Sequence, residues 1–233
     1  MLYGLGSGYF IYALPALLLA LLAQAWVRSA YRRYSRVGNR AQVTGLAAAR
    51  RMAGAVGAPI QIEGVRGTLS DHYDPRSNTL RLSPGVAQQP SVAALAIVAH
   101  ELGHAQQDTH AFALLRLRSG LVPVVNFTSW LGPILFMAGI FLGIYDLAWV
   151  GALCFAGATV FSLVTLPVEL DASRRGMAML RHSGLLLDDG EVRGARTVLT
   201  AAALTYVAAL VQSVSTLLYY GSALGGGRRR RQG

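Results

Sequence analysis

Long apolar stretches dominate the hydrophobic pattern of this chain. Four of them are long enough to cross a bilayer as helices, and none contains Lys or Arg. They cover residues 9–27, 121–145, 147–167 and 198–220. Only a short turn around Tyr145 and Asp146 separates the middle two, so residues 121–167 are expected to form a transmembrane hairpin with both ends on one side. The pattern predicts a mainly α integral membrane protein with about four transmembrane helices.

The polar segments between these stretches predict one small α+β domain in two parts, residues 28–120 and 168–196. Residues 41–56 have helical spacing, and 60–69 and 79–82 are strand candidates separated by a polar cluster that indicates a turn. This hairpin could offer an edge strand to an extended peptide, or it could simply cap the domain.

Composition agrees with a membrane protein, because the chain is 53% hydrophobic, 14% charged and has a mean hydropathy of +0.42. The single cysteine, Cys154, lies in the third apolar stretch and excludes both an intramolecular disulfide and a thiolate zinc site. The net charge of +10 is explained by arginines beside the membrane facing anionic lipid, so we expect no nucleic-acid partner.

The placement of the arginines predicts how the chain is oriented across the membrane. They gather between the first and second spans and between the third and fourth, which are regions on the same face of the membrane. Because positively charged loops stay in the cytoplasm, both parts of the polar domain are predicted to be cytoplasmic. The basic tail at 221–233, with Arg228 to Arg231, disagrees, since it would follow an even number of spans and emerge outside.

The candidate chemistry lies in His100-Glu101-Leu102-Gly103-His104. Two histidines four residues apart on a helix project from one face and can share a zinc ion, while the glutamate between them can take a proton from water at the metal. Pro90 and Ser91 are a good helix start, and the apolar residues after them carry the motif into the interior. The alternative is a helix with two hydrogen-bonded histidines and an exposed glutamate.

A catalytic zinc site needs a third protein ligand, and two residues compete for that role. Glu169 follows the third span on the predicted face of the metal helix. His110 has the spacing of an all-histidine site, but that pattern needs glycine at position 107, where this chain has Gln107. Glu169 is therefore favoured, and His110 is the alternative ligand.

Several motifs together resemble the YugP-type neutral zinc metallopeptidases of bacterial membranes. They stand at residues 69–75, 80–83, 98–107, 117–119 and 166–175. The resemblance covers nearly the whole chain and implies a bacterial inner-membrane zinc peptidase of the gluzincin kind, more distantly similar to the HtpX and CAAX-prenyl proteases. It also favours Glu169 as the third ligand. In those distant relatives an aspartate usually follows this glutamate by four positions, where this chain has Ser173.

These assignments predict an endopeptidase with one zinc ion per chain, in which zinc activates water and Glu101 acts as general base. The substrate is expected to be a peptide or protein. When water attacks a peptide carbonyl, the carbonyl oxygen becomes an oxyanion, which needs a hydrogen-bond donor besides the metal. The candidates for this role or for support of the ligands are His72, Tyr73, Ser173, Arg174 and His182.

Two other functions are compatible with parts of the pattern. A catalytically silent zinc-binding scaffold would close its metal shell with four protein ligands, and no fourth is apparent. A transporter would place ionisable residues within its spans, whereas Asp146 at the hairpin tip is the only charged residue there.

Overall fold

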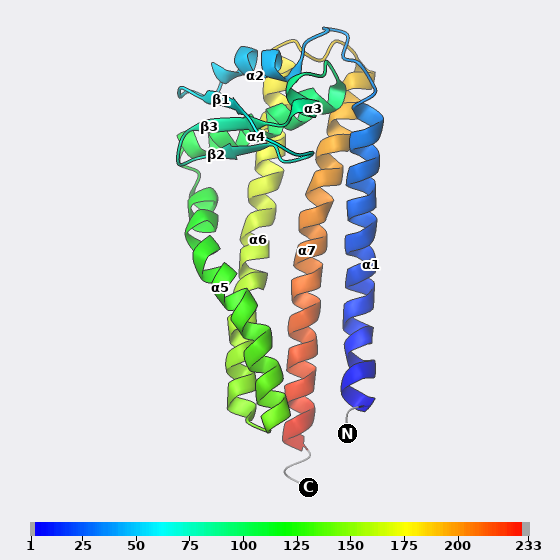
Figure 1. Ribbon diagram of the computed structural model, residues 1–233, viewed down its shortest axis with the longest axis vertical. Coiled ribbons are helices and arrows are strands. Elements are labelled where there is room, and N and C mark those ends of the chain that lie inside the picture. Colours follow the sequence, from blue (N-terminus) through cyan, green and yellow to red (C-terminus); the bar gives the residue numbers. More distant parts are fainter. Residues whose placement is uncertain (1–2, 230–233) are drawn as a thin grey trace. The chain divides into compact units, whose positions relative to one another are not determined.

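The computed structural model describes residues 3–229, and the surroundings of side chains for residues 9–225. Arg230 and Arg231 of the predicted basic tail lie outside the described residues. The described part forms helices and strands in the following order (Figure 1): α1 (Tyr3–Tyr34), α2 (Gly45–Ala53), β1 (Gln61–Gly64), β2 (His72–Asp74), β3 (Thr79–Leu82), α3 (Pro84–Ala87), α4 (Val92–Thr109), α5 (Ala113–Leu142), α6 (Tyr145–His182) and α7 (Asp189–Arg229).

Four of the described helices, α1, α5, α6 and α7, are long and apolar enough to cross a membrane. The predicted class, a mainly α membrane protein with a small α+β part, is confirmed. The helices run beyond the apolar stretches that predicted them. In particular, α6 continues past Pro167 to His182, so a single helix carries both an apolar span and the polar residues that follow it.

The chain divides into two compact units, and the first consists of described residues up to 23, of 117–166, and of those from 205 onward. Small residues let α5 and α6 approach closely in this unit, since a Cβ at Gly139 or Gly151 would meet the backbone of the other helix. Phe136 stacks on Tyr220 of α7 with ring centroids 3.8 Å apart. Gly143, with φ of +71°, makes the turn from α5 to α6.

The second unit consists of residues 24–116 and 167–204 and contains the sheet and α2 to α4. Its core is built around α4, whose Leu95 and Leu102 are fully buried together with Leu180 of α6 and Leu185. As predicted, α4 begins after Ser91, whose hydroxyl accepts a hydrogen bond from Ala94 N at 3.1 Å. A helix that is apolar on nearly all sides has to be buried, and this places its polar motif inside the unit.

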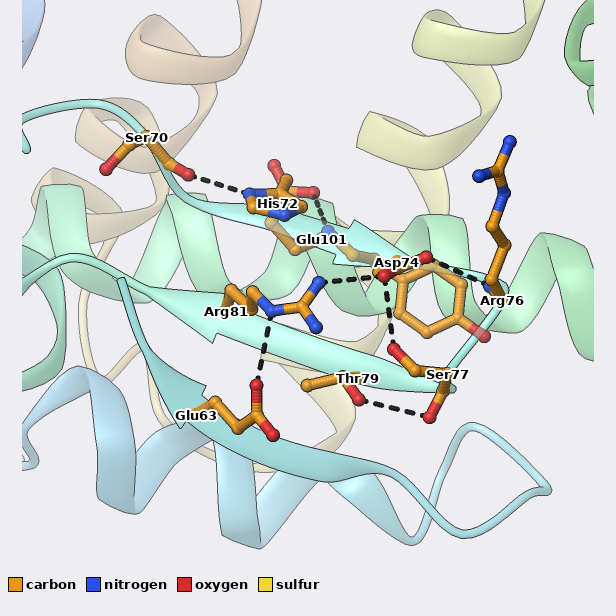
Figure 2. A network of polar contacts seen from close by, with 10 residues as sticks. Glu63, Ser70, His72, Asp74, Arg76, Ser77, Thr79, Arg81 and Glu101 are labelled. Atoms are coloured by element: carbon orange, nitrogen blue, oxygen red, sulfur yellow. Dashed lines mark hydrogen bonds and ion pairs between the residues drawn. The ribbon is translucent and has the colours of Figure 1, made fainter. Parts of the chain in front are cut away.

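The sheet differs from the predicted hairpin. Its order is β1-β3-β2, with β1 parallel to β3 and β2 antiparallel to it, so residues 60–69 and 79–82 do not form a hairpin. The extra strand β2 arises from the polar cluster that was predicted to be a turn. Ion pairs between the strands stabilise β2 in this position. Arg81 of β3 binds Asp74 of β2 at 2.8 Å and Glu63 of β1 at 3.2 Å, so one side chain links all three strands (Figure 2). The hydrogen bond from Arg81 also lowers the pKa of Asp74.

Two glycines allow α4 and α6 to cross at very short range. A Cβ at Gly103 of α4 would collide with the carbonyl oxygen of Ala172, and one at Gly176 of α6 would lie 2.6 Å from the carbonyl oxygen of Ala99. Backbone lies against backbone on both sides of this crossing. The helices therefore cannot accept even a methyl group there without moving apart.

We expect Gly103→Ala to destabilise the protein by about 2 kcal/mol, because overpacking at backbone contacts costs roughly 1–3 kcal/mol. The matched control is Gly54→Ala, since a Cβ at Gly54 meets nothing within 4 Å and its φ of −61° suits alanine. Thermal unfolding of the two purified variants in one detergent measures the difference. Equal melting temperatures would contradict the close crossing.

Candidate metal centre

Two helices bring three potential metal ligands together. His100 and His104 project from one face of α4, with ring centroids 4.8 Å apart, and Glu169 comes from α6. Glu169 Oε2 lies 3.2 Å from His100 Nε2 and 3.4 Å from His104 Nε2. The carboxylate is buried, with 2% of its side chain exposed, and both imidazoles lie within ion-pair distance of it.

The spacing of these atoms suits zinc. A tetrahedral site with bonds of about 2.0–2.1 Å places its ligand atoms about 3.3 Å from one another. The two distances between His nitrogen and carboxylate oxygen are close to that value, and one ligand atom from each residue lies within 4.8 Å of the others. Two imidazoles and one carboxylate also form a donor set that zinc commonly takes in catalytic sites.

Partners on the far side of each imidazole orient the rings. His104 Nδ1 lies 3.0 Å from Gln107 Oε1, and His100 Nδ1 lies 3.1 Å from Ser173 Oγ. An amide oxygen only accepts, so His104 donates from Nδ1 and leaves the lone pair of Nε2 directed at the cluster. Ser173 Oγ lies beside His100 Nδ1 and holds that ring through a hydroxyl, which can donate or accept.

Gln107 is a site residue that sequence reasoning missed, because it was considered only as the residue that replaces a glycine. It is fully buried, and its Nε2 donates to Val168 O at 2.8 Å and to Asp171 Oδ2 at 2.9 Å. One side chain therefore holds a histidine of α4 and the backbone next to Glu169 on α6. The signal in the sequence was its position three residues after His104, on the same face of the helix.

The electrostatics of the cluster are dominated by the two carboxylates near His104. Burial alone would lower the pKa of His104, but its hydrogen bond to Glu169 and the negative charges of Glu101 and Glu169 raise it above the ordinary value. The cluster therefore attracts positive charge, whether a proton or a metal ion.

Glu101 is held by the edge strand of the sheet. The backbone N–H of Tyr73 in β2 donates to Glu101 Oε2 at 3.0 Å, a contact drawn in Figure 2. The Tyr73 hydroxyl lies 2.8 Å from Asn78 Oδ1 and donates to Asp108 Oδ2 of α4 at 3.0 Å, which fixes β2 on that helix. Burial and Asp108 raise the pKa of Tyr73, so the hydroxyl remains a donor.

The other candidate residues lie outside the cluster of potential ligands, which within the described residues comprises His100, His104 and Glu169. His72 Nδ1 is 2.8 Å from Ser70 O, and His182 Nδ1 is 2.8 Å from Ala178 O. His110 caps the end of α4, with Nδ1 3.2 Å from Arg175 Nη1. Arg174 lines a cavity between α6 and α7.

Glu169 follows the third apolar stretch but is not a surface carboxylate, because it is buried. The neighbouring Arg175 is paired with Asp171 at 2.6 Å.

A His-His-Glu cluster with a buried glutamate, in a chain whose described part has four helices able to span a bilayer, is typical of membrane zinc metallopeptidases. The chain belongs to the family described as "Putative neutral zinc metallopeptidase", which matches residues 9–224. It is 40% identical over 213 residues to "Putative membrane protease YugP" of Bacillus subtilis (strain 168), covering 91% of this chain and 94% of that relative. No solved structure matches. The resemblance stated from the sequence is confirmed.

We expect Gln107→Ala to weaken zinc binding by about 10- to 100-fold, since removing a partner that orients a metal-binding histidine typically has that effect. Gln106→Ala is the matched control, because Gln106 donates to Ala55 O at 3.2 Å, away from the cluster. Titration against a coloured zinc chelator gives both affinities. If the two variants held zinc equally well, Gln107 would have no role in positioning His104.

Proposed function

We propose that the protein is a zinc-dependent endopeptidase of the gluzincin kind, with one zinc ion per chain held by His100, His104 and Glu169. The observation that supports this best is the convergence of the three side chains, with Glu169 Oε2 at 3.2 Å and 3.4 Å from the histidine nitrogens and Glu101 next to His100 in the sequence. Family membership supports both zinc and peptide hydrolysis.

When bound at this site, zinc supplies Lewis-acid chemistry that makes water more acidic and draws electrons from the carbonyl group of a peptide bond. Glu101 is the general base. In the free protein Glu101 Oε2 accepts a hydrogen bond from the Tyr73 N–H. During hydrolysis the carboxylate accepts the proton of the attacking water and returns it to the leaving amine. No covalent bond between protein and substrate is required.

The substrate is proposed to bind as an extended strand along β2. This strand lies at the edge of the sheet, and its Tyr73 N–H points to Glu101 rather than to β3. Backbone pairing at such an edge aligns a peptide bond with the base without demanding a particular side chain. His72 precedes Tyr73 on the same strand and is exposed, which makes it our preferred candidate for a donor to the oxyanion.

A silent zinc-binding scaffold is the second candidate function. Its metal shell would be closed by a fourth protein ligand. Three potential ligands converge in the part of the chain that the structure describes. This arrangement favours the catalytic type of site, in which one position is left for water or substrate.

The orientation in the membrane is also a proposal. The arginine-rich segments at 28–120 and 168–196 support an active site that faces the cytoplasm, in the inner membrane of a bacterium.

We expect Glu101→Gln to keep zinc and the fold but to lower peptide hydrolysis at least about a hundredfold, because glutamine cannot accept the proton at neutral pH. Cleavage of a fluorogenic peptide library, measured with zinc content by elemental analysis, tests both parts. An active Glu101→Gln variant would remove Glu101 from the mechanism.

Two companion variants separate the roles of ligand and base. Glu169→Gln should lose zinc as well as activity, and added zinc should restore part of its activity. Added zinc should restore none of the activity that Glu101→Gln has lost. His110→Ala should change neither zinc content nor rate. Loss of zinc in His110→Ala together with full zinc in Glu169→Gln would instead favour the three-histidine site.

Cysteine labelling tests the orientation. In a Cys154→Ala background, Ser77→Cys and Ser183→Cys should resist an impermeant thiol reagent in intact cells, because both lie in segments proposed to be cytoplasmic. Ile144→Cys, at an exposed position between α5 and α6, should react and serves as the positive control. The reverse labelling pattern would place the active site outside the cell.

A further inference from the structure

A cavity of about 540 Å³ lies between α6 and α7 in the second unit. Its lining is of two kinds. Basic side chains come from Arg174 and Arg181 of α6 and from Arg196 of α7, and apolar ones include Leu170 and Leu199. This volume is within the range of about 300–1,000 Å³ typical of sites for small molecules.

Within the described part of the chain, the three arginines of this cavity form no ion pair with a carboxylate. No described Asp or Glu lies within ion-pair distance of Arg174, Arg181 or Arg196, although other arginines of the same unit are paired. The nearby carboxylate of Asp171 is bound by Arg175 at 2.6 Å. Arg174, Arg181 and Arg196 are solvent-exposed, and three positive charges around one open cavity give it a positive potential. The cavity is therefore suited to an anionic ligand.

The apolar part of the lining indicates what kind of anion fits. Leu170 lies three residues beyond the apolar stretch of α6, which ends at 167, and Leu199 and Ala203 belong to the apolar stretch of α7, which begins at 198. Farther from these stretches along the two helices come Arg181 and Arg196. The cavity thus joins apolar positions to positive charge. A free phosphate would use only the arginines, whereas a phospholipid would use both parts of the lining.

We propose that this cavity binds the phosphate group of an anionic phospholipid, with Arg174, Arg181 and Arg196 as its ligands and the start of an acyl chain beside Leu170 and Leu199. A guanidinium group binds phosphate oxygens through two parallel hydrogen bonds, which makes arginine well suited to the role. Ser173, which supports His100, also lines the cavity. The proposal does not depend on the protein being an active peptidase.

Native mass spectrometry of the full-length protein in detergent tests the proposal, with phosphatidylglycerol and phosphatidylcholine added in turn. The variant Arg181→Gln/Arg196→Gln should bind phosphatidylglycerol about thirtyfold more weakly than the unaltered protein, because each arginine contributes roughly 1 kcal/mol to binding anionic lipid. Binding of phosphatidylcholine should not change. The charge-matched control Arg50→Gln/Arg51→Gln, at exposed positions of α2 outside the cavity, should retain phosphatidylglycerol.

Three outcomes would overturn the proposal. If the α2 control lost as much phosphatidylglycerol as the cavity variant, binding would reflect overall charge. If glycerol 3-phosphate or inorganic phosphate bound as tightly as phosphatidylglycerol, the ligand would be a soluble phosphate. If an acidic peptide displaced the lipid at equal concentration, the cavity would serve a polypeptide. Should the double variant unfold, Arg181→Gln and Arg196→Gln tested singly should each weaken phosphatidylglycerol binding several-fold, and unchanged binding in both would reject the site.

Discussion

The backbone contact between α4 and α6 is the constraint on which the candidate metal centre depends. Gly103 and Gly176 remove the side chains that would keep the two helices at ordinary separation. Only at this short range does the carboxylate of Glu169 reach both His100 and His104, because its side chain has few bonds with which to span a gap. The chemistry of the site thus rests on two residues that carry no chemistry themselves.

Much of the site could be predicted from the sequence, because its parts are local. The two histidines and Glu101 lie within one turn of a helix whose apolar flanks and Ser91 cap are plain in the sequence, and the helical period places them. Glu169 was favoured over His110 as the third ligand for two reasons. The all-histidine pattern needs a glycine at position 107, where this chain has Gln107, and the family resemblance also favours Glu169. The structure supports that preference by bringing Glu169 into the cluster and placing His110 beside Arg175.

What could not be predicted depends on contacts between segments far apart in the chain. The strand β2 was read as a turn because Asp, Asn, Pro and Ser are common in turns, yet Arg81 binds Asp74 across the sheet and stabilises a strand there. In the same way, Gln107 gains its role from Val168 and Asp171, some sixty residues away. A pattern within a few neighbouring residues of the sequence does not indicate partners that lie this far away along the chain. The four long helices were predictable because hydropathy over about twenty residues needs no knowledge of neighbours.

The hydrogen bond between Tyr73 N–H and Glu101 Oε2 has a consequence for the order of events at the site. A backbone amide has one hydrogen to donate. A peptide strand that pairs with β2 at Tyr73 therefore competes with Glu101 for the same donor, and the carboxylate is released as the strand docks. On the proposed mechanism, the free protein therefore holds Glu101 in a resting position, and the arriving peptide frees the carboxylate to act as the base.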